Sequence, residues 1–342
     1  MLLATLLAAG LPFYAETSAI DWNEAQALGQ VFVDRAVLRP EPGAPAVVES
    51  ERQNRANRPF RDLLVSWNVD APAATGFAVE LSVRQEGQGR WSPWMHVGQW
   101  GEVPVGERVV ACDGGQVDVD FFRGSATFDG AQVRVRAHAT AGGKTVRVRN
   151  LTLCYSDRQR TVKPRAALAE RPLGKVLDVP RRSQKVERAE IAGRICSPTS
   201  VAMVLSFRGV DVGTAAVCER AYDRAHEIYG NWPHNVQAAY TFGVPGHLAR
   251  YADWADVERA ILDGQPLVIS IAAKPGELGG APYPKTDGHL LVLCGFDAQG
   301  DCVVNDPAAS DPDEVRRVYK RADLEQVWMG RGGVAYVLLP RP

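Results

Sequence analysis

The pattern that most constrains the fold is a period-two alternation of apolar and polar residues in the first half of the chain. Between Trp22 and Tyr155, stretches such as residues 77–83 and 117–121 alternate in this way, and Gly-rich turns (E-G-Q-G, D-G-G-Q, A-G-G-K) separate them. Such alternation is typical of strands with one buried face joined by tight turns. We therefore predict an antiparallel β-sandwich of jelly-roll type over residues 20–157.

The pattern changes near Lys163, where helical spacing of apolar residues replaces the alternation. We expect four helices, over residues 197–207, 214–228, 235–242 and 253–262, and then four strands, over residues 267–272, 289–296, 302–305 and 333–339. Helices followed by an antiparallel sheet form an α+β layout, unlike alternating βαβ units. We therefore assign residues 158–175 to a basic, proline-containing linker and residues 176–342 to an α+β domain.

Size, charge and the first residues limit the class of protein further. A chain of 342 residues suits two domains, and the net charge of −1 argues against nucleic acid or an anionic membrane as the main partner. The opening run M-L-L-A-T-L-L-A-A-G-L-P-F-Y-A resembles the apolar core of a signal peptide, although it has no basic n-region. We expect residues 1–19 to be a signal segment, the protein to be secreted or held in the cell envelope, and no transmembrane segment elsewhere.

The cysteines do not suggest a disulfide framework. There are six, and if one is a free nucleophile the remaining five cannot all pair. Cys112 and Cys154 both lie in the β-rich half, and theirs is the one bridge that we expect.

Cys196 is the first candidate for chemistry, because it lies just ahead of an expected helix with Pro198 in the first turn. A helix N-terminus lowers the pKa of a thiol, and the thiolate is the form that attacks carbonyl carbons. The alternative for Cys196 is a buried structural cysteine, which is common for this residue type.

His289 and Asp306 add weight to the catalytic interpretation. His289 opens one expected strand and Asp306 ends the next, across the turn D-A-Q-G-D. In an antiparallel hairpin they share a face only if the register is odd, and Asp306 could then orient the imidazole as the third member of a triad does. That register keeps Cys294 and Cys302 apart unless a bulge at Gly300 intervenes. It therefore argues against a disulfide between them and against a zinc site with His289, so we expect no metal and no cofactor.

The oxyanion that forms on attack needs preorganised donors. The backbone N–H of Cys196 and the side-chain amide of Gln184 are the candidates. Together, the three side chains and these donors are the parts of a thiol-based acyl-transfer site.

Five motifs occur in order: V-P-R-R-S-Q, I-C-S-P-T-S-V-A-M-V-L, G-N-W-P-H-N-V, T-D-G-H-L-L-V-L-C-G-F and V-N-D-P-A-A. They resemble the bacteriocin-processing (double-glycine leader) type of papain-like cysteine peptidase, and more closely its stand-alone bacterial relatives without transporter domains. The resemblance covers residues 176–339 and implies a papain-like fold. It implies that Cys196 is the nucleophile, His289 the base, Asp306 the orienting acid and Gln184 the oxyanion glutamine. Ser197 departs from the many members of the wider family that carry glycine after the cysteine.

The resemblance also places Asn231, Trp232 and His234 near the cleft as candidate substrate-binding residues, the alternative being a turn with a half-buried tryptophan. The loop at residues 274–288 precedes His289 and is rich in Gly and Pro, so we expect it to act as a mobile substrate lid.

The sequence thus predicts a cysteine peptidase that acts on a peptide or protein substrate. One alternative keeps the thiol site but makes the protein an amidase or transpeptidase, and another makes it a non-catalytic binding module of the same fold. A third puts the function in the β-sandwich, where four tryptophans (Trp67, Trp91, Trp94 and Trp100) would bind a glycan if they form an exposed row. Because several of them lie beside alternating apolar residues, we favour core aromatics.

Overall fold

The computed structural model describes residues 26–31, 36–50, 52–54, 59–103, 110–159 and 173–341. The chain divides into two compact units, one up to residue 161 and one from residue 162. The expected signal segment at residues 1–19 and most of the expected linker at 158–175 lie outside the described residues.

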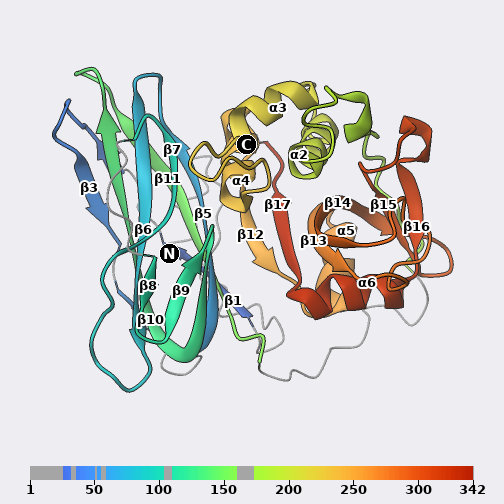
Figure 1. Cartoon of the computed structure of the whole chain (residues 1–342), viewed down its shortest axis with the longest axis horizontal. Helices are drawn as coiled ribbons and strands as arrows, with labels where there is room; N and C mark the ends of the chain where they lie inside the picture. Colours follow the sequence, from blue (N-terminus) through green and yellow to red (C-terminus); the bar gives the residue numbers. More distant parts are fainter. Residues whose placement is uncertain are drawn as a thin grey trace. The chain divides into compact units, whose positions relative to one another are not determined.

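The first unit is all-β, as the alternation predicts (Figure 1). All strand pairs in it are antiparallel, and the main path through the sheet runs β1-β11-β5-β10-β6-β7. Its strands are β1 (Gln26–Val31), β2 (Ala36–Leu38), β3 (Ala46–Glu49), β4 (Gln53–Asn54), β5 (Phe60–Asp70), β6 (Thr75–Gln85), β7 (Met95–Gly101), β8 (Ala111–Cys112), β9 (Gly115–Asp118), β10 (Phe121–Ala139) and β11 (Val146–Ser156).

The long strand β10 changes partners along its length. Its first residues pair with β5 and β9, and from Phe128 onward it pairs with β6, with a register shift near Gly130. The inward residues of the long strands form one apolar cluster around Trp67, which is fully buried and meets Phe77 edge to face at 6.1 Å. One face of each alternating stretch therefore supplies the core of this unit.

The tryptophans of the first unit form no exposed row among the described residues. Trp67 is in the core, and the other three are half-buried. The guanidinium of Arg84 lies 5.7 Å from the ring of Trp91, and that of Arg134 lies 4.4 Å from the ring of Trp94. These arginines cover apolar ring surface that a sugar would need, so the glycan alternative has no support here.

The expected bridge between Cys112 and Cys154 is wrong, since all six cysteines are free thiols. Cys112 packs against the core cluster from the β8–β9 hairpin. Cys154 is a buried residue of β11, but it alternates with Leu153 and Tyr155, which belong to that cluster, and therefore points to the other face of the sheet. Two thiols on opposite faces cannot meet.

The second unit has the α+β layout that the sequence predicts, with an antiparallel sheet of order β12-β17-β13-β14-β15-β16 (Figure 1). Helix α2 packs on β14 and β13, and the next two helices, α3 and α4, pack against α2 and against each other. The elements are α2 (Cys196–Phe207), α3 (Thr214–Ala221), α4 (Trp232–Thr241), β12 (Gly246–Arg250), α5 (Trp254–Leu262), β13 (Leu267–Ala273), β14 (Thr286–Phe296), β15 (Cys302–Asn305), β16 (Arg316–Tyr319), α6 (Arg321–Val327) and β17 (Val334–Leu338), with short 3₁₀ turns η2 (Gln184–Val186), η3 (Pro312–Glu314) and η4 (Met329–Arg331).

Helix α3 is shorter than predicted, ending at Ala221 instead of residue 228. The carboxylate of Asp223 accepts the backbone N–H of Ala225 at 2.9 Å, and the backbones of Asp223 and Ile228 pair as an isolated bridge. A short acidic side chain that bonds nearby backbone favours a turn over a continuing helix. The sequence also missed β12, β16 and α6. Within the described residues, no helix is long and apolar enough to cross a membrane.

The β14–β15 hairpin combines both registers that the sequence analysis considered. Val292 pairs with Asn305 and Leu293 with Val304 in the odd register, and the pairing then shifts. The bulge lies at Cys294 and Gly295, between the two registers, and not at Gly300, where the sequence analysis considered one. Gly295 adopts a φ of +149° and lets the chain at Lys175 and Val176 pass close by.

We expect Gly295→Ala to lower the free energy of unfolding by at least about 2 kcal/mol, since strained backbone and a steric clash both add to the cost. A Cβ at this position would lie 2.1 Å from the carbonyl oxygen of Lys175. Gly193→Ala is the matched control, because a Cβ there meets nothing within 4 Å. Urea unfolding of both variants checks this, and equal stability of the two would contradict it.

Candidate active site

Cys196 is the first residue of α2, and its side chain is partly exposed. The preceding Ile195 is fully buried and anchors the start of the helix. Backbone hydrogen bonds from Leu290 and Ser197 reach the sulfur, so the thiol lies where unpaired N–H groups favour a negative charge.

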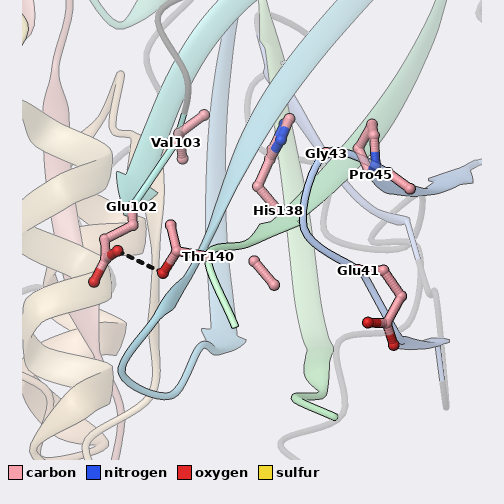
Figure 2. A pocket seen from close by; sticks show the side chains of 9 residues that line it. Glu41, Gly43, Pro45, Glu102, Val103, His138 and Thr140 are labelled. Carbon is pink, nitrogen blue, oxygen red and sulfur yellow. Dashed lines mark hydrogen bonds between the residues drawn. The ribbon is translucent and has the colours of Figure 1, made fainter. Parts of the chain in front are cut away.

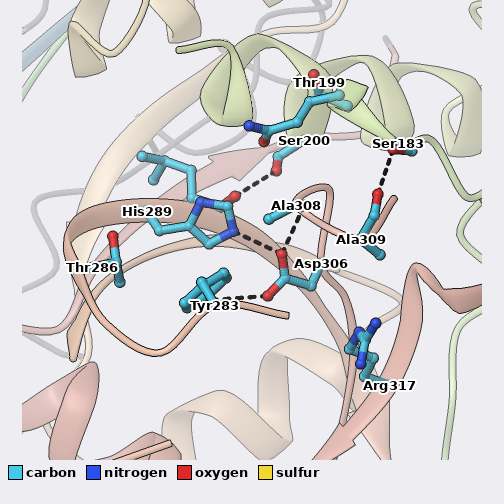
Figure 3. Close-up of polar contacts among 12 residues, drawn as sticks. Ser183, Thr199, Ser200, Tyr283, Thr286, His289, Asp306, Ala308, Ala309 and Arg317 are labelled. Carbon is cyan, nitrogen blue, oxygen red and sulfur yellow. Dashed lines mark hydrogen bonds and ion pairs between the residues drawn. The ribbon is translucent and has the colours of Figure 1, made fainter. Parts of the chain in front are cut away.

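His289 lies on β14 and Asp306 directly follows β15. The Nε2 atom of His289 is 2.7 Å from Oδ1 of Asp306, and both side chains are buried (Figure 3). His289 also makes a side-chain hydrogen bond with Cys196. Because Nε2 faces Asp306, that contact uses Nδ1. The structure therefore brings together the three side chains that the sequence analysis selected.

The charges of these three groups reinforce one another. Burial alone raises the pKa of Cys196 and of Asp306 and lowers that of His289. The mutual interactions outweigh burial. Asp306 and Cys196 raise the pKa of His289 to about 10, His289 lowers that of Asp306 to about 2, and His289 with the backbone donors holds that of Cys196 below its ordinary value. The site therefore favours a thiolate beside an imidazolium.

Asp306 accepts four hydrogen bonds. Besides His289, the backbone N–H of Ala308 donates to Oδ1 at 2.9 Å, and the hydroxyls of Tyr283 and Tyr319 donate to Oδ2 at 2.9 and 2.7 Å. The sequence analysis missed both tyrosines. Tyr283 lies in a loop with no regular pattern and Tyr319 on the unexpected strand β16, so no signal of periodicity or spacing could have found them.

Gln184 is buried, and its backbone N–H donates to the carbonyl of Pro307 at 2.9 Å, next to Asp306. Its Nε2 donates to the carbonyl of Ala192 at 2.8 Å, four residues before Cys196. This bond folds the intervening turn against the glutamine and fixes which end of the amide is nitrogen. Gln184 is not among the residues that line the cleft beside Cys196, and its oxyanion role stays a prediction.

The three candidate substrate-binding residues, Asn231, Trp232 and His234, differ in their positions. Trp232, the first residue of α4, lines a cleft beside Cys196. Asn231 is the buried N-cap of that helix, accepting the N–H of His234 at 3.1 Å and donating to Asp223 at 2.8 Å. His234 is itself buried within α4. Neither Asn231 nor His234 is among the residues that line the cleft. The hydrogen bonds of Asn231 give it a capping role, and substrate contact by these residues stays a prediction.

The cleft has a volume of about 460 Å³ and contains Cys196. Glycines, apolar side chains and a few charged groups line it, among them Tyr229, Gly230, Asp287 and Arg331. The loop at residues 274–288, expected to be a mobile lid, is tied to the domain. Glu277 pairs with Arg331 at 3.1 Å, and the hydroxyl of Tyr283 bonds to Asp306.

A separate cavity of about 510 Å³ lies in the first unit, between the β2–β3 turn and the ends of β7 and β10. His138, Glu41 and Glu102 line it, and Glu102 accepts a hydrogen bond from Thr140 at 2.9 Å (Figure 2). No thiol lines it. Across the described residues, no group of three or more His, Cys, Asp or Glu could hold a metal ion.

Comparison with known families gives the class of each unit. Residues 176–336 match the Peptidase_C39 like family, and residues 46–156 match the Peptidase C39 N-terminal domain. The first unit is thus similar to a C39 N-terminal domain and the second to C39-like peptidases, in agreement with the resemblance in the motifs. The second domain is cysteine-peptidase-like.

Several solved structures are similar to this chain. A C39-like peptidase from Bacillus anthracis is 21% identical, with a TM-score of 0.38, over 49% of this chain and 98% of that one. A double glycine motif protease from an AMS/PCAT transporter, in complex with a leader peptide, is 18% identical (TM-score 0.33, 50% and 97%). The peptidase domain of Streptococcus ComA is 17% identical (TM-score 0.31, 49% and 98%). None of the curated proteins matches the chain.

We expect limiting iodoacetamide at about pH 6 to label Cys196 before any other cysteine, because an ordinary thiol is almost fully protonated there. Burial raises the pKa of Cys218 and Cys294 to about 12, so both serve as internal controls. His289→Ala should slow the labelling of Cys196 by about tenfold or more. Peptide mapping by mass spectrometry checks this, and slow labelling of Cys196 in both proteins would contradict it.

Proposed function

We propose that the second domain is a cysteine peptidase that hydrolyses peptide bonds through Cys196, His289 and Asp306. The observation that carries this proposal is a partly exposed thiol in a cleft, hydrogen-bonded to a buried imidazole that a buried carboxylate holds. Structural cysteines lack this arrangement, as the buried, high-pKa thiols elsewhere in the domain illustrate. The match to the C39-like peptidase family supports the same class.

The reaction begins from the thiolate–imidazolium pair. The Cys196 sulfur attacks the carbonyl carbon of a peptide in the cleft, and the carbonyl oxygen becomes an oxyanion. The backbone N–H of Cys196 and the second Nε2 hydrogen of Gln184 are the donors that we assign to it. His289 then gives its Nδ1 proton to the leaving amine, the C–N bond breaks, and an acyl-enzyme forms on Cys196.

The second half of the reaction releases the acyl group. Water enters, neutral His289 takes a proton from it, and the resulting hydroxide attacks the thioester. The thiolate leaves, and the imidazolium forms again beside it. Asp306 accepts no proton in this cycle, because the hydrogen bonds to its carboxylate and the charge of His289 keep its pKa near 2.

We predict that Cys196→Ala abolishes peptide turnover and leaves the fold nearly unchanged, since the variant removes a single sulfur from a partly exposed residue. Cys218→Ala, which deletes a buried thiol on α3, is the matched control and should retain activity. Digestion of a diverse peptide mixture, with new termini mapped by mass spectrometry, checks this. Turnover by pure Cys196→Ala protein would sink the assignment, and products joined to an added amine would reveal transfer instead of hydrolysis.

We also predict that Asp306→Ala slows turnover less than His289→Ala, which should lose roughly 10²–10⁴-fold, because Asp306 orients the ring while His289 moves the proton. Removing Asp306 orphans two buried tyrosine hydroxyls, so Asp306→Asn accompanies it as a variant of the same shape. Rates are compared only for variants with wild-type circular dichroism. A greater loss in folded Asp306→Asn than in His289→Ala would contradict the assigned roles.

A further inference from the structure

The oxygen of Asp306 that points away from His289 is held by two tyrosines from different parts of the domain. Tyr283 reaches Oδ2 from the loop before β14, and Tyr319 reaches it from β16, at 2.9 and 2.7 Å. Figure 3 shows Tyr283 beside the carboxylate and close to the imidazole. Its ring also meets His289 edge to face, with centroids 5.0 Å apart and an angle of 68° between the planes. Tyr283 therefore contacts both members of the His–Asp pair.

The two oxygens of the carboxylate have different partners. The N–H of Ala308 and the ring of His289 already bind Oδ1. Each tyrosine hydroxyl has a single hydrogen, and each gives it to Oδ2, so two positive dipole ends converge on one oxygen. Burial, and then the negative charge of Asp306, raise the pKa of both tyrosines above the ordinary range. Both hydroxyls are therefore protonated, and are donors, at neutral pH.

We propose that Tyr283 and Tyr319 are positioning residues of the active site, which hold the far oxygen of Asp306 and thereby limit how firmly His289 keeps its proton. This inference rests on the proposed function. Hydrogen bonds to Oδ2 draw negative charge away from the oxygen that faces the imidazolium. Without them a less neutralised carboxylate would stabilise the imidazolium further. His289 would then be a weaker acid toward the leaving amine.

The other groups that could affect His289 are few. Cys196 faces it from α2, Asp287 precedes it on β14 and lines the cleft, and Arg317 lies near the tyrosines on β16. All three remain in place when a tyrosine becomes phenylalanine. A change in the titration of His289 in such a variant therefore reports the lost hydroxyl.

The test follows the rate of Cys196 alkylation by iodoacetamide from acid to alkaline pH in the full-length protein. A first rise marks formation of the thiolate–imidazolium pair. A second rise marks loss of the His289 proton, which leaves a more nucleophilic thiolate. Imidazole ¹³C shifts in histidine-labelled protein, assigned with His289→Ala, follow the same proton directly. Neither readout needs a substrate.

We expect Tyr283→Phe to move the second rise upward by about half a pH unit or more, with Tyr319→Phe moving it in the same direction. Tyr336→Phe is the matched control. It removes another buried hydroxyl, 2.9 Å from Oγ of Ser197, that does not bond to Asp306, and it should leave the second rise unmoved. Tyr283 is only half-buried, so its variant should fold even if Tyr319→Phe does not.

The proposal would be overturned if the second rise in alkylation rate occurred at the same or a lower pH in folded Tyr283→Phe. It would also be overturned if Tyr336→Phe moved this rise to higher pH by an equal amount. Those outcomes differ from failure of the proposed function. If Cys196 of the wild-type protein shows no early rise at all, the thiolate–imidazolium pair itself is absent. If both rises are present in the wild type and unchanged in the variants, only the role of the tyrosines fails.

Discussion

The hydrogen bond between His289 and Asp306 is the contact on which the rest of the site depends. A buried imidazolium is costly unless an anion offsets the loss of water, and Asp306 supplies that anion at 2.7 Å. The bond also occupies Nε2 and so directs Nδ1 toward Cys196. The charge that Asp306 holds on His289 in turn lowers the pKa of the thiol. The chemistry of the site therefore depends on the fold, because the β14–β15 register decides whether His289 and Asp306 lie on the same face of the sheet.

The elements that sequence reasoning predicted best are those with a strong local signal. Alternation identified the all-β first domain, and apolar spacing with a cysteine at its start identified α2. The rule that paired residue numbers in a hairpin have a constant sum predicted that His289 and Asp306 could be neighbours if that sum is odd. The pairing of Val292 with Asn305 has this odd register. These inferences held because the period of a strand and the start of a helix are local properties of the chain.

What the sequence could not predict depends on contacts between distant segments. The bulge at Gly295 lies where the chain near Lys175, far away in sequence, passes against β14. Cys112 and Cys154 lie in the same domain, but their faces follow from how each strand is placed on the core. The hydroxyls of Tyr283 and Tyr319 converge on Asp306 from a loop and from an edge strand, neither of which has a periodic pattern. The resemblance placed Asn231 near the cleft, but its side chain caps α4.

The most direct test of this account is to measure the ionisation of Cys196 at rest, without substrate or alkylating reagent. The ultraviolet absorbance of the thiolate is recorded from acid to alkaline pH, and the curve for Cys196→Ala is subtracted from that of the wild type. We predict a thiolate already present at neutral pH, which disappears in acid and also disappears at neutral pH in His289→Ala. A thiolate that forms only near the ordinary cysteine pKa of about 8.5 in both proteins would contradict it.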